Sequence, residues 1–215
     1  MMNNSGNTPR SYMYRLLSIF FAKELSPENI KNIQSGETSQ LMEALEGIEA
    51  YAPIMIRLKE YFAEMTDLNH AALDLAESYA WLFHGVAGPP PAPLSSSVYL
   101  SPNGNILQEP EAEFYTLLQK YQLSSKTYAN EPCDHLSVIL EFISRLDEQA
   151  ETAENPGPWI QEQKTAIEKH LLSWLPDFAT RCRQGDNLGF YADLAKDTLA
   201  FVTEDNRQLS LVCAG

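Results

Sequence analysis

Apolar residues recur at three- and four-residue intervals along most of the chain, and no segment alternates with the two-residue period of a half-buried strand. Each interval pattern places an apolar stripe on one face of a helix. About nine segments show it, around residues 13–21, 27–35, 39–49, 54–65, 69–83, 114–121, 136–146, 167–174 and 188–202. The pattern therefore predicts an all-α fold, a helical bundle of about nine helices.

Residues that begin and end helices lie between these segments. Ser26 before Pro27 is typical of an N-cap followed by a first-turn proline, and Gly36 is typical of a helix end. The run at residues 155–158, Asn-Pro-Gly-Pro, separates two of the later helices.

One long stretch, residues 86–108, has no helical period and is rich in proline and serine. A connection of this length without helical pattern is uncommon inside a compact domain and is often functional. It predicts an N-terminal helical half at 9–85 and a C-terminal helical half at 109–204. Residues 205–215 then form a tail of unknown role.

The charge balance excludes some classes of partner. The 215 residues include 29 acidic and 15 basic side chains, giving a net charge of −14, which disfavours binding to nucleic acid or to an anionic membrane surface. No apolar run approaches the roughly 20 residues that cross a bilayer. The three cysteines, which are widely spaced and odd in number, suit a reducing cytoplasm better than a disulfide framework.

Acidic residues are concentrated in the middle of the chain. Residues 24–154 carry 21 acidic and 6 basic side chains, whereas residues 155–215 carry 8 and 6. Two interpretations stay open: a solvated surface that keeps the protein soluble, or a surface that attracts a basic peptide.

A short polar string opens the helix predicted at 136–146, with the sequence Glu-Pro-Cys-Asp-His-Leu at residues 131–136. Pro132 and Asp134 are typical of a first helical turn, because one lacks an amide hydrogen and the other favours the helix dipole. Glu131 and His135 are four residues apart, so a helix would place a carboxylate and an imidazole on one face. The string is interpreted either as an ordinary helix start or as a site.

Recognised catalytic patterns are missing from the sequence. It contains neither HExxH nor a GxSxG elbow, and neither GxGxxG nor a P-loop. His84, which stands before Gly85, is interpreted as a charge at a helix end, and His70 and His170 are isolated. We therefore expect no catalytic residues and no metal site.

Residues 131–136 match in full the signature E-P-x-D-H-L of the TorD/DmsD/NarJ-type chaperones of bacterial molybdoenzymes. The chain resembles this family from about residue 10 to residue 204. The blocks at 174–178, 181–184 and 189–192 resemble the TorD branch in particular. The earlier half is similar as well, with Tyr-x-x-Leu-Phe at 79–83 before a proline-containing loop that ends in Ser-x-Tyr at 97–99.

The resemblance implies a cytoplasmic, non-enzymatic chaperone. Such a protein binds the twin-arginine signal peptide and the core of a molybdoenzyme apoprotein, which for the TorD branch is trimethylamine N-oxide reductase. The client, rather than the chaperone, receives molybdopterin guanine dinucleotide before Tat export. The resemblance also implies weak guanine nucleotide binding without a permanent cofactor, and a monomer, a homodimer or both, with residues 86–108 as a hinge for exchange between protomers.

The resemblance implies a peptide-binding site as well. Apolar parts of the signal peptide would dock along helix faces, while its two arginines meet carboxylates. The residues carried over are the groove lining Tyr79, Leu82 and Phe83, the recognition corner Pro132, Asp134 and His135, and in addition Glu131 and Tyr99. Two alternatives remain: a chaperone of the same fold for a dimethyl sulfoxide, formate or nitrate reductase, and a small helical metal-dependent hydrolase that uses His135 with Glu131.

Overall fold

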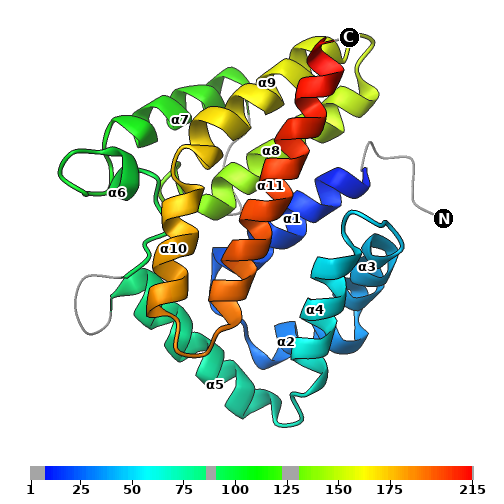
Figure 1. The fold of residues 1–215 in the computed structure, drawn as a ribbon, viewed down its shortest axis with the longest axis vertical. Coiled ribbons are helices and arrows are strands. Elements are labelled where there is room, and N and C mark those ends of the chain that lie inside the picture. The colour runs from blue at the N-terminus through cyan, green and yellow to red at the C-terminus, as the bar shows by residue number, and fades with distance from the viewer. Residues whose placement is uncertain (1–7, 86–90, 123–130, 215) are drawn as a thin grey trace.

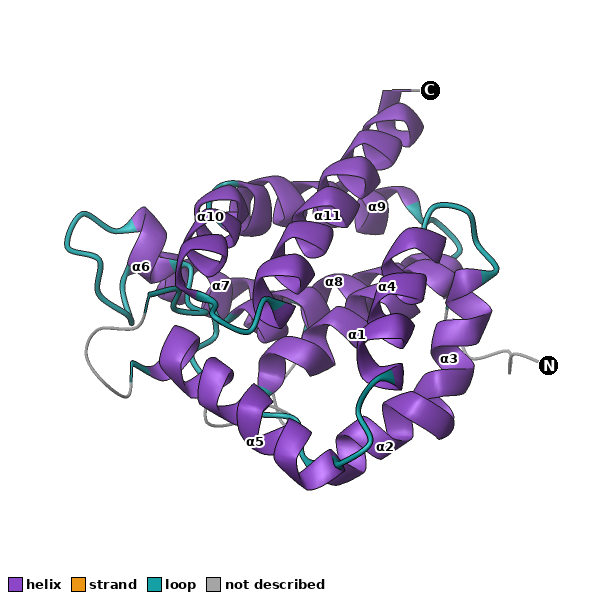
Figure 2. Cartoon of the chain, turned by 60° about the horizontal axis from the view of Figure 1, so that its bottom comes forward, coloured by secondary structure: helices purple, strands orange, loops and turns teal. Residues whose placement is uncertain are grey.

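The structure, a computed structural model, describes residues 8–85, 91–122 and 131–214. This part of the chain consists of helices and their connections and forms no strand (Figure 2). One isolated antiparallel bridge pairs Ser95 with His135. The prediction of an all-α fold is confirmed.

The first part of the chain forms five α-helices and a short π-helical segment. Thr8 and Ser26 cap the first two helices through hydrogen bonds exchanged with Ser11 and Asn29, which confirms Ser26 as an N-cap. The elements are α1 (Pro9–Ala22), α2 (Pro27–Ser35), α3 (Glu37–Glu46), α4 (Ala52–Ala63), α5 (Leu68–Tyr79) and the π-helical segment η1 (Ala80–His84).

The second part begins with a single helical turn inside the predicted 86–108 connection. Residues 86–90 of that connection lie outside the described residues. The elements that follow are α6 (Ser97–Leu100), α7 (Glu109–Lys120), α8 (Leu136–Thr152), α9 (Gly157–Ile167), the π-helical segment η3 (Glu168–Leu172), α10 (Leu175–Gly185) and α11 (Phe190–Ala214).

α1 runs through the middle of the molecule, between the early and the late helices (Figure 1). Its most extensive packing is on α8, far along the chain. Met13, Leu16, Leu17 and Phe21 of α1 are fully buried, so that removing this apolar surface from water stabilises the contact between the two predicted halves.

A buried polar cluster strengthens the same contact. Arg10 of α1 donates to Asp205 of α11 from Nε at 2.5 Å and from Nη2 at 2.7 Å, and to Asp147 of α8 from Nη1 at 2.5 Å. Arg10 also donates to Gln163 of α9, and the hydroxyl of Tyr14 donates to Asp205 at 2.6 Å. One guanidinium thus connects four helices.

Two boundaries differ from those predicted. α11 continues through residues 205–214, and Leu209 is buried, so these residues are the last turns of a helix rather than a separate tail. The segment predicted as one helix at 167–174 is the widened end of α9, and a new helix begins at Leu175. Pro176 marks that start, because proline suits a first helical turn. The division into halves remains a prediction.

Candidate functional site

Asp134 joins the connection at 91–96 to the beginning of α8. Its side chain is fully buried, and Oδ2 accepts hydrogen bonds from Ser95 Oγ at 2.8 Å, Ser96 Oγ at 3.1 Å and Ser97 N at 2.7 Å. The amide of Leu136 also donates to the carbonyl of Leu94 at 2.7 Å. The carboxylate therefore fixes the loop against the helix start and does not itself face solvent.

His135 is the N-cap of α8. Its Nδ1 lies 2.7 Å from Ser137 Oγ and accepts from Ser137 N at 3.3 Å, and its Nε2 lies 3.8 Å from Glu131 Oε2. Burial lowers the pKa of His135 from 6.5 to about 4, with a smaller lowering by His84 and an opposing effect of Asp134. The imidazole is therefore neutral at pH 7, while the carboxylate of Glu131 is half-buried at its edge.

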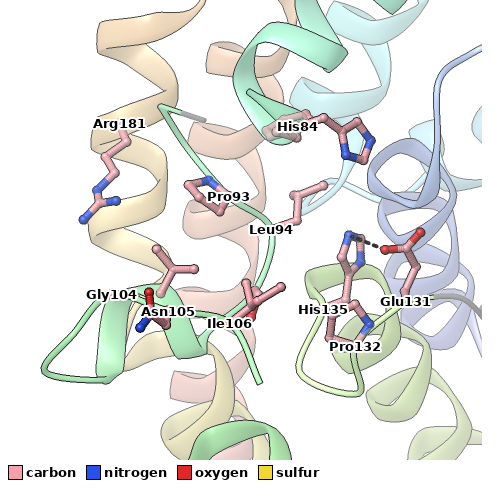
Figure 3. Close-up of a pocket in the computed structure, with 13 residues that line it drawn as sticks. His84, Pro93, Leu94, Gly104, Asn105, Ile106, Glu131, Pro132, His135 and Arg181 are labelled. Carbon is pink, nitrogen blue, oxygen red and sulfur yellow. Dashed lines mark ion pairs between the residues drawn. The ribbon is translucent and has the colours of Figure 1, made fainter. Parts of the chain in front are cut away.

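An open pocket of about 620 Å³ lies beside this helix start. We call it the motif pocket. Figure 3 shows His135, Pro132 and Glu131 on one wall, with Arg181 of α10 on the wall opposite. Its lining is Phe83, His84, Pro93, Leu94, Ser95, Val98, Gly104, Asn105, Ile106, Glu131, Pro132, His135 and Arg181.

Four of the predicted residues line this pocket, namely Phe83, Glu131, Pro132 and His135. The other four, Tyr79, Leu82, Tyr99 and Asp134, are not among its lining residues.

Two of these, Tyr79 and Leu82, are buried in the core. The hydroxyl of Tyr79 donates to the carbonyl of Phe21 at 3.0 Å, and its ring packs edge-on against Phe83 with centroids 4.8 Å apart. Their position supports the pocket wall, and their role in peptide binding remains a prediction.

Tyr99 supports the loop side of the motif pocket. Its hydroxyl donates to the carbonyl of Pro93 at 2.9 Å, and its ring packs on Trp174 with centroids 5.1 Å apart. The guanidinium carbon of Arg181 lies 4.5 Å from the centroid of the Tyr99 ring, within cation–π range. Tyr99 thus positions Arg181 at the pocket wall.

Sequence reasoning missed several lining residues. His84 was interpreted as a helix end, and Ile106 and Arg181 were given no role in the site. The predicted helical face that includes Phe83 could have pointed to His84, its neighbour in η1. No sequence signal connects Ile106 with Arg181, because they come from separate elements that meet only in the fold.

The titratable residues of the described ranges form no group of three or more that could hold a metal ion. Cys182 is buried and Cys133 is half-buried, and burial raises the pKa of both thiols, whereas Cys213 is exposed. Within the same ranges, no helix combines the length and apolar character needed to cross a bilayer.

The helical fold has a known counterpart. A crystal structure of a protein described as a redox enzyme maturation protein from Archaeoglobus fulgidus matches with a TM-score of 0.53 and 19% identity, over 90% of this chain and 93% of that one. This likeness establishes the fold.

Sequence relatives then define the family. The nitrate reductase delta subunit family matches residues 38–180. Chaperone protein TorD of Vibrio vulnificus is 31% identical over 94% of this chain and 95% of the relative, and that of Shewanella loihica is 32% identical over 93% and 92%. The chain belongs to the nitrate reductase delta subunit family, in the group that contains the TorD chaperones, and this confirms the predicted family.

Membership of this family decides between the two classes of protein considered from the sequence, a chaperone and a hydrolase. The relatives are chaperones and not catalysts, so this chain is a chaperone of molybdoenzyme maturation and not an enzyme. The alternative of a metal-dependent hydrolase based on His135 and Glu131 is therefore wrong. In the structure Nδ1 of this histidine is engaged with Ser137, which explains the short polar string as a capped helix start beside a pocket.

Proposed function

We propose that this chain acts in the cytoplasm, where it binds the twin-arginine signal peptide and the core of a molybdoenzyme apoprotein. The client receives its molybdenum cofactor before Tat export. The client that we favour is trimethylamine N-oxide reductase, and relatives named TorD support that choice. The chain itself would hold no permanent cofactor, with at most weak binding of a guanine nucleotide.

The motif pocket is the observation that carries this proposal. It is open to solvent and is bounded by apolar side chains, among which Ile106 is 51% exposed. Apolar side chains of a signal peptide would bury this surface, as in other complexes in which a peptide lies in a groove. The imidazole of His135, which is neutral at pH 7, adds no charge to this apolar contact.

Calorimetric titration with synthetic signal peptides tests the proposal. The panel contains the signal peptides of trimethylamine N-oxide, dimethyl sulfoxide, formate and nitrate reductases. We expect the first to bind most tightly. Tighter binding of another would reassign the client within the same fold, and no binding by any of them would overturn the proposal.

A matched pair of variants tests the pocket. Ile106→Asn removes an exposed apolar side chain from the lining, and Leu107→Asn removes its neighbour, which is 62% exposed and does not line the pocket. We expect Ile106→Asn to weaken peptide binding by about tenfold and Leu107→Asn to leave it unchanged, because only one of the two is buried by the peptide. If Ile106→Asn and Leu107→Asn changed the affinity equally, the peptide would bind outside the motif pocket.

A further inference from the structure

A second groove begins at η1 and extends along α5. Its first part, of about 640 Å³, is lined by Asp74, Glu77, Ser78, Ala80, Trp81, Asn187 and Leu188. It shares Asp74 and Leu188 with a neighbouring hollow of about 430 Å³, which reaches Glu64, Asp67 and His70. We call the two together the α5 groove. Among the described residues, none lines both this groove and the motif pocket.

The charges that line the α5 groove are almost all negative. Four carboxylates, those of Glu64, Asp67, Asp74 and Glu77, stand on exposed side chains, and no lysine or arginine belongs to the described lining. Asp67 is partly engaged, since it accepts from the first amides of α5. His70 also belongs to the described lining, and its Nε2 lies 3.6 Å from Asp74 Oδ2.

Electrostatic effects of this cluster reach the groove floor. The pKa of Tyr61 is raised to about 12, mainly by burial and to a smaller extent by the carboxylates of Asp186 and Asp74. A deprotonated phenol is disfavoured beside negative charge, whereas a cation in the same place would be stabilised.

The groove also has an exposed apolar surface. Trp81 and Leu188 are each 39% exposed, and they come from different walls. Figure 1 shows the turn between α10 and α11, which carries Leu188, beside α5. Apolar surface beside carboxylates matches a ligand that combines positive charge with an apolar side chain.

Hydrogen bonds fix both walls of the groove in place. The indole Nε1 of Trp81 donates to the carbonyl of Gly185 at 3.1 Å, and Ser78 Oγ donates to Asp186 Oδ1 at 2.8 Å. Asp186 also accepts from the amides of Leu188 at 3.0 Å and Ala192 at 2.9 Å. A surface that is ordered before binding loses less conformational entropy when a ligand arrives.

These features select one kind of occupant. Nucleic acids and anionic membranes are repelled by the carboxylates. A polypeptide segment with neighbouring arginines suits them, because guanidinium groups pair with carboxylates through two hydrogen bonds and stack on indole rings.

We propose that the α5 groove holds the basic stretch of the client signal peptide, while the motif pocket takes its apolar stretch. The inference rests on the proposed function and refines it. Glu131 is the one carboxylate in the described lining of the motif pocket, and Arg181 stands opposite it. Two adjacent guanidinium groups therefore find more complementary charge along Asp74 and Glu77.

The test measures the affinity of two peptides for each of three proteins. One peptide is the signal peptide of a trimethylamine N-oxide reductase, and the other has both of its arginines replaced by glutamine. The proteins are wild type, Asp74→Asn/Glu77→Gln, and a control, Glu151→Gln/Glu154→Gln. The control removes two exposed carboxylates with the same spacing, Glu151 in the last turn of α8 and Glu154 just after it, so the net charge changes equally.

We expect wild type and the control to prefer the arginine peptide by about tenfold, because each exposed ion pair contributes a modest share of binding. The Asp74→Asn/Glu77→Gln variant is expected to lose this preference while it still binds the glutamine peptide. Nuclear magnetic resonance provides a second measurement: the arginine peptide should shift the indole N–H signal of Trp81, and the glutamine peptide should not.

The possible failures are distinguishable. If wild type binds neither peptide, the proposed function and this inference both fail. If wild type binds both and the preference survives in Asp74→Asn/Glu77→Gln, only the inference fails. Equal loss of preference in both double variants would show an effect of overall charge. That result would also overturn the proposal that the α5 groove binds the arginines.

Discussion

Asp134 has no exposed surface, yet it belongs to the most recognisable string in the sequence. Its Oδ2 accepts three hydrogen bonds from residues 95–97, while Oδ1 has no hydrogen-bond partner within the described ranges. We expect Asp134→Ala to lower the free energy of unfolding by about 3 kcal/mol, because three donors lose a charged acceptor. Urea denaturation measures this, with the exposed Glu154→Ala as a control that changes stability by less than about 0.5 kcal/mol.

Urea denaturation together with calorimetric titration of a signal peptide decides how Asp134 affects binding. If Asp134→Ala retains wild-type stability and loses only affinity for a signal peptide, the carboxylate contacts the peptide directly. That result would contradict the position of Asp134 in the structure.

His135 makes stability depend on pH. Its pKa is about 4 in the folded chain and 6.5 as an ordinary histidine, so between these values the unfolded chain binds the additional proton. The free energy of unfolding therefore falls as the pH drops from 6.5 to 4, by about 3 kcal/mol for this group. We expect His135→Gln to reduce the slope of the profile measured by urea denaturation in this window, and the remaining slope reflects His170, whose pKa burial also lowers to about 4.

The exposed His70 provides the matched control for that profile. His70→Gln should leave the pH dependence of unfolding as it is in wild type. An unchanged profile in His135→Gln would mean that the imidazole is accessible to protons in the folded chain.

At the scale of elements, α10 ends at Gly185 in close contact with Leu82 of η1 and with Pro91. A Cβ added at Gly185 would lie 2.9 Å from Pro91 Cβ and 3.1 Å from Leu82 Cδ2. Although alanine favours helices more than glycine does, we expect Gly185→Ala to lower the free energy of unfolding by about 1–2 kcal/mol through overpacking.

Gly47 is a suitable comparison for Gly185, because a Cβ there would meet only the carbonyl of Ala44 at 3.4 Å. Thermal unfolding should show Gly47→Ala to be as stable as wild type or slightly more stable. A Gly185→Ala protein as stable as wild type would contradict the tight contact of Gly185 with Leu82 and Pro91.

Most helices could be predicted from the sequence because their signals are local. Ser26 and Gly36 mark helix ends through hydrogen bonds with their own neighbours in the chain. The π-helical segments could not be predicted, since their widened turns at 80–84 and 168–172 depart from the regular helical period. The motif pocket was only partly predictable, because Ile106 and Arg181 approach it through packing between distant elements.

At the scale of the whole molecule, Arg10 determines whether the predicted halves can separate. Its guanidinium contacts carboxylates of α8 and α11 from the first turn of the first helix. We expect Arg10→Ala to lower the free energy of unfolding by about 3–5 kcal/mol, because two carboxylates with little exposure lose their cation. The exposed Arg183→Ala should have little effect in the same denaturation experiment.

Calorimetry tests the cooperativity that this cluster implies. Since α1 packs most extensively on α8, we expect the wild-type chain to unfold in a single transition. Two resolved transitions would instead show that residues 9–85 and 109–204 unfold independently.

The ion pairs between Arg10 and Asp205 have a consequence for synthesis on the ribosome. α1 emerges first, but its partner carboxylate lies 195 residues later in the chain. Domains usually fold as units once their residues are available. During translation α1 therefore lacks this partner until α11 has left the exit tunnel, and a nascent chain interrupted between codons 147 and 205 would have only one of the two carboxylates that pair with Arg10.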